Sequence, residues 1–354
     1  MHSYEIILSI LVISHNQQDL LSRCLDSILK QRMDFSYEII ISDDTSIDNT
    51  WNIILGYIAK YPDLIFGYRV NSDECNPVNN SQRSGWNRCN AYSKSRGKYI
   101  IHIDADDYFI GTDVLQSQVE MLEKHSDCSL CMQNIWILDE GATFETGRSW
   151  FPLHKFHNEQ IITAKEFIQE DYFIINQAFV MRRNPDIDPA ALYGKRYVDS
   201  VITFHHLQFG NIVCVDHCDY VYVKHSSAIT STLSEIDKAV LWCLPIYIPL
   251  LIPRFTGLYF SSGLKDILRL VNMAREGSKL TKTSANSIKN MGAYIFDTFS
   301  NPEHSIFDLV RLNVSRIYLV SMIKLNFLNT NALRVLYYLI ISKRIEKNVC
   351  FEIE

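Results

Sequence analysis

The feature that most limits the fold of this chain is a short apolar run that ends abruptly in acids. Residues 98–107 read KYIIHIDADD, in which the run from Tyr99 to Ile103 is followed by three carboxylates, Asp104, Asp106 and Asp107. The run predicts a buried strand. In an extended chain Asp104 and Asp106 point to the same side, so their oxygens can converge on one hard cation such as Mg²⁺ or Mn²⁺. The alternative is an acidic surface turn, because turns favour Asp.

Two earlier segments repeat this pattern of a buried strand with a polar end. Residues 5–13, EIILSILVI, form a near-continuous apolar run that is followed by Ser14-His15-Asn16. Residues 37–44, YEIIISDD, end in the acidic pair Asp43-Asp44. Near-continuous apolar runs are typical of parallel strands that are covered on both faces.

Helical patterns separate these strands. Apolar residues recur with helical spacing over residues 18–32, and a second helix is expected from about residue 49 to residue 60. Alternating strands and helices predict an α/β fold with a doubly wound, mostly parallel sheet flanked by helices. In such sheets ligands bind beyond the carboxyl ends of the strands, where the acidic clusters lie.

The alternation continues further along the chain. Residues 71–90 are polar and rich in Asn and Ser, so they predict a loop that leads into a helix ending near Gly97. Residues 128–138, CSLCMQNIWIL, are expected to form one strand. The remaining predicted elements are a helix over 113–124, a strand over 172–183, a short helix with Asp199 in its first turn, and two strands within 211–232.

Charge divides the chain into two regions. Residues 1–238 carry a net charge of −12, whereas residues 239–354 carry 14 Lys and Arg against 8 Asp and Glu. The acidic region suits cations and the basic region suits anionic surfaces. Nucleic acid is not expected as a partner, because the basic residues are spaced among Leu, Ile and Tyr. The nine cysteines are scattered and indicate no disulfide framework, which fits a reducing cytoplasm.

The C-terminal region, residues 239–354, is expected to be mainly helical. Its apolar run at 241–253 contains three prolines and is too short to span a membrane as a helix. Residues 305–345 predict long amphipathic helices with interspersed basic residues. Such helices either lie in a membrane interface, which would be the inner face of the cell membrane, or pack on the catalytic domain or a partner.

The order of the motifs resembles that of the family-2 glycosyltransferases of the GT-A fold. The resemblance covers about residues 4–232 and rests on SILVISHNQQDLLSRCLDSIL, YEIIISDDTSIDNT, RGKYIIHIDADD, a loop with Arg88, and an acid before a helix. It implies a Rossmann-like catalytic domain over residues 1–238. It also implies inverting transfer of a sugar from a nucleotide-diphosphate donor, foremost a UDP-sugar, to a hydroxyl of a cell-surface glycan or lipid-linked acceptor.

The resemblance assigns nucleotide contacts to individual residues. Ser14 and Asn16 match the beginning of the nucleotide pocket. Asp44 matches the acid that accepts a hydrogen bond from the base, and Asp43 lies beside it. Arg88 matches a basic residue that faces the nucleotide or its diphosphate, although Cys89 replaces the Asn that usually follows.

The resemblance also assigns the metal and the base. Asp104 and Asp106 match the family's D-x-D motif: Asp106 would bind Mn²⁺ or Mg²⁺ directly, and Asp104 would reach the ribose or a metal-bound water. His225 matches a late histidine that completes the metal site. Asp199 matches the general base, although Val198 replaces the Glu that often precedes it. Trp136, Trp150, His205 and His206 either contact the acceptor or serve packing.

Two other functions remain open at this point. A sugar-nucleotide pyrophosphorylase would carry a glycine-rich basic loop after the first strand, where this chain has SHNQQD. A catalytically inactive sugar-nucleotide-binding or scaffold protein of a glycan assembly complex would keep the fold, and the replacements at Cys89 and Val198 fit it.

If the basic C-terminal helices bind membranes, the full chain should float with anionic vesicles in a density gradient and residues 1–238 alone should not. The reason is that basic amphipathic helices gain both apolar burial and attraction to anionic lipids. Equal recovery of the two chains in the bottom fraction would favour helices that pack on protein.

Overall fold

The computed structural model describes residues 5–71, 74, 80–139, 148–150, 156–169, 179–186 and 199–225. The chain divides into two compact units, Met1–Ser231 and Thr232–Glu354, and every described residue belongs to the first. The predicted boundary after residue 238 and the helical C-terminal region therefore lie outside the described residues and stay predictions. Among the helices that are described, none has the length and apolar character needed to cross a membrane.

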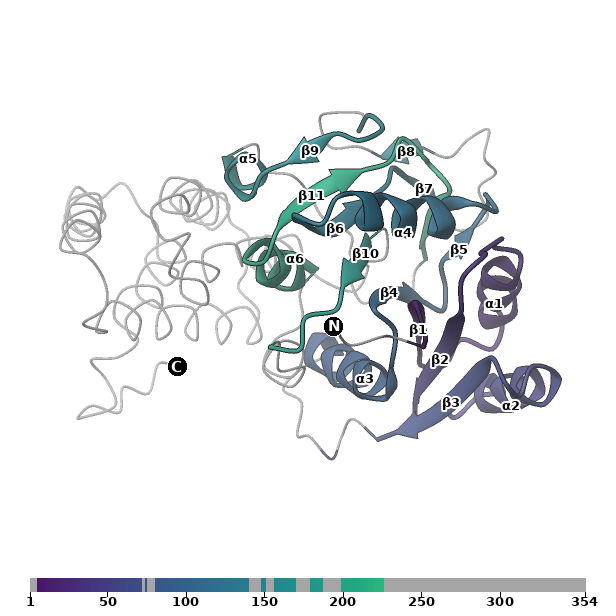
Figure 1. Ribbon diagram of the computed structural model, residues 1–354. Helices are drawn as coiled ribbons and strands as arrows, with labels where there is room; N and C mark the ends of the chain where they lie inside the picture. Colours follow the sequence, from purple (N-terminus) through teal and green to yellow (C-terminus); the bar gives the residue numbers. More distant parts are fainter. Residues whose placement is uncertain are drawn as a thin grey trace, which may run out of the picture. The chain divides into compact units, whose positions relative to one another are not determined.

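The core of the first unit is an eight-stranded sheet in the order β3-β2-β1-β4-β10-β6-β11-β9 (Figure 1). Strands β3, β2, β1 and β4 are parallel, and β10 runs antiparallel to both of its neighbours. All seven residues of β1 are buried, as the apolar run predicts. The strands are β1 Leu8–Ser14, β2 Tyr37–Asp44, β3 Ile65–Val70, β4 Tyr99–Asp104, β6 Cys128–Met132, β9 Ile161–Ile162, β10 Phe179–Arg182 and β11 Asn211–Cys214.

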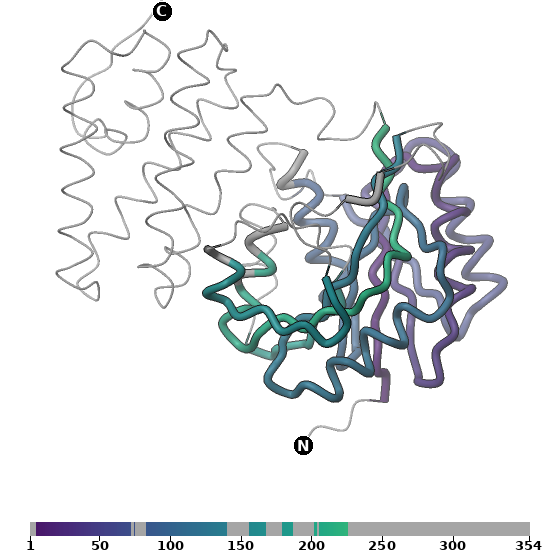
Figure 2. The backbone as a smooth tube through the Cα atoms, turned by 90° about the horizontal axis from the view of Figure 1, so that it is seen from above, coloured from purple at the N-terminus to yellow at the C-terminus, as the bar shows by residue number. Residues whose placement is uncertain are grey.

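Helices cover both faces of the parallel part of the sheet. Helices α1 (Leu21–Leu29) and α2 (Thr50–Lys60) lie on one face and α3 (Asn80–Lys94) lies on the other (Figures 1 and 2). This arrangement confirms the predicted α/β class with a mostly parallel, helix-flanked sheet. The remaining described helices are α4 Val114–Lys124, α5 Ala164–Gln169 and α6 Asp199–Leu207.

The prediction of a loop over residues 71–90 is wrong for its second half, because α3 begins at Asn80. The sequence of α3 is mostly polar, and its few apolar residues, among them the buried Ala91 and Tyr92, do not form the continuous apolar stripe that identifies a helix packed on a sheet. Its buried side chains include Asn87 and Arg88, each only 2% exposed, and they bond to polar strand ends rather than to apolar side chains. Strand β3 was not predicted at all.

The prediction of one strand over residues 128–138 is also wrong. The chain leaves the large sheet after β6 and enters a second sheet as β7 (Ile135–Asp139). The break lies at Gln133 and Asn134, where the Asn134 N–H donates to the His217 carbonyl at 2.8 Å. An apolar run interrupted by two amides therefore marks the passage between two sheets.

The second sheet has the order β5-β12-β7-β8 and begins directly after the acidic residues of β4. Its central strand β12 carries the Tyr220 hydroxyl, which donates to Asp107 Oδ2 at 2.6 Å, and the Val223 N–H, which donates to Asp107 Oδ1 at 2.9 Å. Asp107 thus joins β12 to the end of β4. The other strands are β5 Tyr108–Phe109, β12 Tyr220–Lys224 and β8 Arg148–Trp150.

Replacing Tyr220 with Phe should lower the free energy of unfolding by about 1–3 kcal/mol, because it leaves an oxygen of the buried Asp107 carboxylate without its donor. Urea unfolding at pH 7 measures the change. Tyr57→Phe is the matched control, since the Tyr57 hydroxyl donates to the exposed carboxylate of Asp26 at 2.7 Å. An equal, small loss in both variants would contradict a structural role for the Tyr220–Asp107 bond.

A second prediction concerns acid stability. Burial, with a smaller contribution from His205, lowers the pKa of His206 to about 3. The folded chain therefore favours neutral His206, and its contribution to stability is present above pH 6.5 and is lost as the pH falls toward 3. One such group lowers stability by at most about 1.4 kcal/mol per pH unit. Urea midpoints between pH 7.5 and 4.5 should show a shallower decline in His206→Phe, while His157→Gln at the exposed His157 should follow the wild type.

Candidate functional site

The predicted site residues of three parallel strands lie at one edge of the large sheet. Ser14 is opposite Asp43 in the register of β1 and β2, and Ile13 is opposite Asp104 in the register of β1 and β4. Asp44 ends β2. The carboxyl ends of parallel strands meet at the same edge, so the sequence prediction that these side chains share a site agrees with the backbone.

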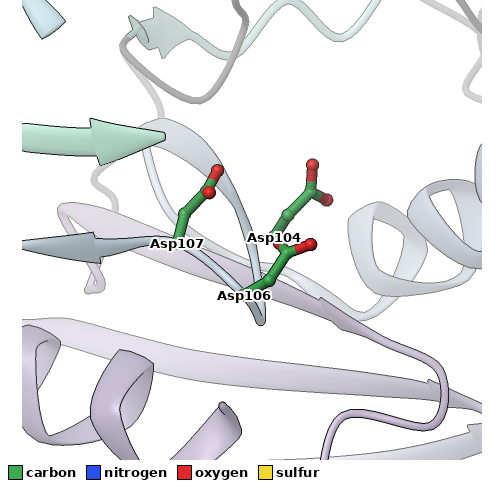
Figure 3. Close-up of side chains that lie close together, drawn as sticks. All are labelled: Asp104, Asp106 and Asp107. Atoms are coloured by element: carbon green, nitrogen blue, oxygen red, sulfur yellow. The ribbon is translucent and has the colours of Figure 1, made fainter. Parts of the chain in front are cut away.

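The acidic residues 104–107, hereafter the acidic turn, are not an extended chain. Strand β4 ends at Asp104, and the Asp107 N–H donates to the Asp104 carbonyl at 3.0 Å, which closes a turn. One oxygen from each of Asp104, Asp106 and Asp107 lies within 4.8 Å of the others (Figure 3). The expected convergence is present, but the expected extended geometry is wrong: the turn brings the carboxylates together and adds Asp107.

Each carboxylate of the acidic turn has a hydrogen-bond partner from α3 or from β12 and the residue that follows it. Arg88 of α3 donates through Nη2 to Asp104 Oδ1, and His225, directly after β12, places Nε2 2.6 Å from Asp106 Oδ2. Asp107 accepts from β12. Three carboxylates this close repel one another, and these separate donors offset the repulsion.

Asp107 differs from the other two acids in its environment. It is 1% exposed, and burial followed by the charges of Asp106 and Asp104 raises its pKa well above the ordinary value, against the two hydrogen bonds from β12. Both of its oxygens accept hydrogen bonds within the chain. Asp107 therefore supports the turn, whereas the side chains of Asp104 and Asp106 remain 27% and 17% exposed.

The donor set fits a hard divalent cation. Carboxylate oxygens are the ligands that Mg²⁺ and Mn²⁺ prefer, and two partly exposed carboxylates on one turn leave further positions for oxygens of a ligand. Asp104 and Asp106 are the residues that would bind the ion. In this structure the His225 imidazole acts as a hydrogen-bond partner of Asp106, and its role as a metal ligand stays a prediction.

The loops that follow β1 and β2, which the resemblance assigns to the nucleotide, are joined by hydrogen bonds to each other. The Asn16 N–H donates to Ser46 Oγ at 2.8 Å, and Asn16 Oδ1 accepts from the Ile47 N–H at 2.9 Å. The Gln17 N–H donates to Thr50 Oγ1 at 2.8 Å. Asn16 has a φ of 52°, a conformation that Asn tolerates better than most residues. The Asn16 side chain therefore shapes this loop pair.

The acidic pair at the end of β2 has two distinct environments. Asp43 is fully buried and accepts hydrogen bonds from Ser46, with Arg69 Nε 3.4 Å from its Oδ2. Asp44 is 3% exposed and accepts from Arg83 Nε of α3 at 3.0 Å. Asp43 therefore stabilises the turn after β2, and its assignment to the nucleotide stays a prediction, as does that of Asp44.

The remaining predicted residues lie at more varied positions. Asp199 begins α6, as expected, but its side chain and that of Trp150 lie outside the described residues. Trp136 of β7 is half-buried against the cluster of Leu138, Val221 and Val223. His206 is 2% exposed, which favours the packing alternative. His205 is half-buried.

Several residues of α3 contact the strand ends, and the sequence analysis identified only Arg88 among them. Arg83 bonds Asp44, and Asn87 Nδ2 donates to the Ser14 carbonyl at 3.1 Å. Asn90 Nδ2 donates to Ser42 Oγ at 2.9 Å. The available signal was the spacing of Arg83 and Asn87, four residues apart, which places both on one face of a helix.

Comparisons with known proteins agree with this architecture. The family model described as glycosyl transferase family 2 matches residues 9–188. An uncharacterized protein of Mycobacterium tuberculosis is 28% identical over 242 residues, which cover 66% of this chain and 63% of that protein. The match thus spans less than two thirds of that relative. A poly(ribitol-phosphate) beta-glucosyltransferase of Bacillus spizizenii is 37% identical over 109 residues, or 30% of this chain and 16% of that enzyme.

A solved structure shares the fold at low identity. The S. aureus protein TarS, residues 1–349 in complex with UDP-GlcNAc, superposes with a TM-score of 0.54 at 18% identity, covering 82% of this chain and 81% of that one. The family model covers the strands whose ends form the site, including the acidic turn. This chain therefore belongs to glycosyl transferase family 2.

Proposed function

We propose that this protein transfers a sugar from a nucleotide-diphosphate donor to a hydroxyl of a glycan or lipid-linked acceptor, with inversion at the anomeric carbon. The observation that carries the proposal is the convergence of three carboxylates within 4.8 Å at the strand edge that also bears Asp44. Membership of the family supports the reaction class. UDP-sugars are the foremost donors that the resemblance implies, and a carboxylate at Asp44 can accept a hydrogen bond from an N–H of uracil or of another base.

Different groups would bind the base and the diphosphate of the donor. Asp44, fixed by Arg83, would receive the base, and Ser14 would line the beginning of the pocket. Asp104 and Asp106 would bind Mn²⁺ or Mg²⁺, and a bound ion neutralises charge that develops on the departing nucleoside diphosphate. Arg88 lies beside Asp104 and adds a positive charge at the same end.

Asp199 is the proposed general base. Its carboxylate accepts the proton of the acceptor hydroxyl as the oxygen forms a bond to the anomeric carbon, and the bond to the diphosphate breaks with its electron pair on the leaving phosphate oxygen. One displacement of this kind inverts the anomeric centre. Asp199 is the first residue of α6, which agrees with an acid that precedes a helix, the position that the resemblance assigns to the base.

Acceptor class is proposed from the relatives and from charge. The Bacillus enzyme is named for a polymer of ribitol phosphate, which is rich in hydroxyls and negatively charged. The region after residue 238 has a net charge of +6 and suits an anionic acceptor or lipid surface. A glycan that bears phosphate, either as a polymer or as a lipid diphosphate, satisfies both observations.

The function is tested with a panel of UDP-, GDP- and dTDP-sugars, with and without Mn²⁺. A bound donor should raise the melting temperature by mass action, and the full shift should need the ion. Asp106→Asn should abolish the metal-dependent part of the shift. Asp199→Asn should keep the shift but lose release of nucleoside diphosphate in the presence of acceptor, by about 100-fold or more if it is the base.

The outcomes separate the alternatives. A shift without any release of nucleoside diphosphate by the wild type would favour a binding or scaffold protein. Formation of nucleotide sugar from sugar phosphate and nucleoside triphosphate would favour a pyrophosphorylase. An intact metal-dependent shift in Asp106→Asn would show that the metal binds elsewhere.

A further inference from the structure

We propose that Arg23 is a positioning residue for the acidic turn, which fixes the backbone at Asp106 and thereby strengthens binding of the divalent cation. The proposal rests on the proposed function in one respect, the assignment of the ion to Asp104 and Asp106. Nothing in the motifs of the sequence singles out Arg23, which lies on the exposed side of α1.

Two neighbouring side chains of α1 contact main-chain carbonyls of the acidic turn. Arg23 Nη2 donates to the Asp106 carbonyl at 3.0 Å, and the neighbouring Cys24 Sγ lies 3.7 Å from the Asp104 carbonyl. The backbone oxygens of the two proposed metal ligands are thus bonded by α1, whereas their side-chain oxygens are bonded by Arg88 and His225. The turn is fixed from two directions, and α1 supplies one of them.

A second contact fixes Arg23 itself. The guanidinium carbon lies 4.3 Å from the centre of the Tyr108 ring, the first residue of β5. Tyr108 is paired with Val221 of β12, the strand that also donates to Asp107. A planar guanidinium can stack on a ring and donate from its edge at the same time, whereas an ammonium group has no planar fork to stack. The arginine therefore connects α1, β5 and the turn.

Two effects of Arg23 on cation binding have opposite signs. Its positive charge repels a cation, so by charge alone its removal should strengthen binding. Its hydrogen bond restrains the Asp106 backbone, so by position its removal should weaken binding, as loss of an outer partner of a metal ligand commonly does by 10–100-fold. The sign of the change in affinity therefore decides between charge and position.

The experiment measures Mn²⁺ affinity of the full chain by calorimetry, without donor or acceptor. Arg23→Met retains the apolar stem but removes the donor and the charge, and we expect it to weaken Mn²⁺ binding about 10-fold. Arg23→Lys retains the charge but not the stacked fork, and should weaken binding as well. Tyr108→Phe keeps the ring under the guanidinium and should bind like the wild type.

Lys30→Gln is the matched control for charge, because Lys30 is an exposed cation just after the same helix. It should leave Mn²⁺ affinity unchanged or slightly strengthen it. Thermal unfolding of each variant checks the fold, and Arg23→Lys serves as the deciding variant if Arg23→Met does not fold. Asp106→Asn should abolish Mn²⁺ binding, which would show that the ion binds at the acidic turn.

The results distinguish this proposal from the proposed function. Mn²⁺ binding by Arg23→Met or Arg23→Lys that equals or exceeds that of the wild type, while Asp106→Asn abolishes it, overturns the role of Arg23 alone. A wild-type chain that binds no Mn²⁺, or one whose binding survives Asp106→Asn, overturns the metal assignment and this role together. Weaker binding in both Arg23 variants with unchanged melting temperature supports the proposal.

Discussion

The carboxylates of the acidic turn repel one another, and the surrounding residues of the site must offset this repulsion. Three acids whose oxygens lie within 4.8 Å of one another are stable only when their charge is compensated. The carboxylates are bonded by an arginine from α3 and by a tyrosine and a histidine from β12 and its end, and the Arg23 side chain of α1 donates to a main-chain carbonyl of the turn. Elements distant in sequence therefore converge on four residues.

Much of the sheet could be predicted from the sequence, because burial on both faces leaves a direct pattern. Strand β2 has the predicted bounds, and β1 and β4 agree within a few residues. Strand β3 escaped prediction because only its first residue, Ile65, is fully buried and the others are half-buried or exposed, so its pattern is weak. The split between β6 and β7 escaped because both halves are apolar and only two amides intervene.

The sequence pointed to the acids of the candidate site and to two of their partners, Arg88 and His225, but not to the other partners. Carboxylates after an apolar run stand out, since few charged residues follow a buried strand without a reason. The arginines that bond them, Arg69 and Arg83, have no such signal, because an arginine on a polar segment looks like any solvated cation. Helix α3 shows the general cause: its buried face bonds to polar strand ends, and apolar periodicity cannot detect a polar interface.

Several hydrogen bonds to the acidic turn come from residues that are far away in the sequence, which affects how the chain folds. The bonds from Tyr220, Val223 and His225 join residues that are 113, 116 and 119 positions apart in sequence. Closing loops of this length costs more chain entropy than pairing β1 with β2, so we expect such contacts to form late. During synthesis the acids emerge from the ribosome after Arg23 and Arg88 but more than one hundred residues before Tyr220, Val223 and His225. We therefore expect the acidic turn to be among the last parts of the unit to reach its final structure.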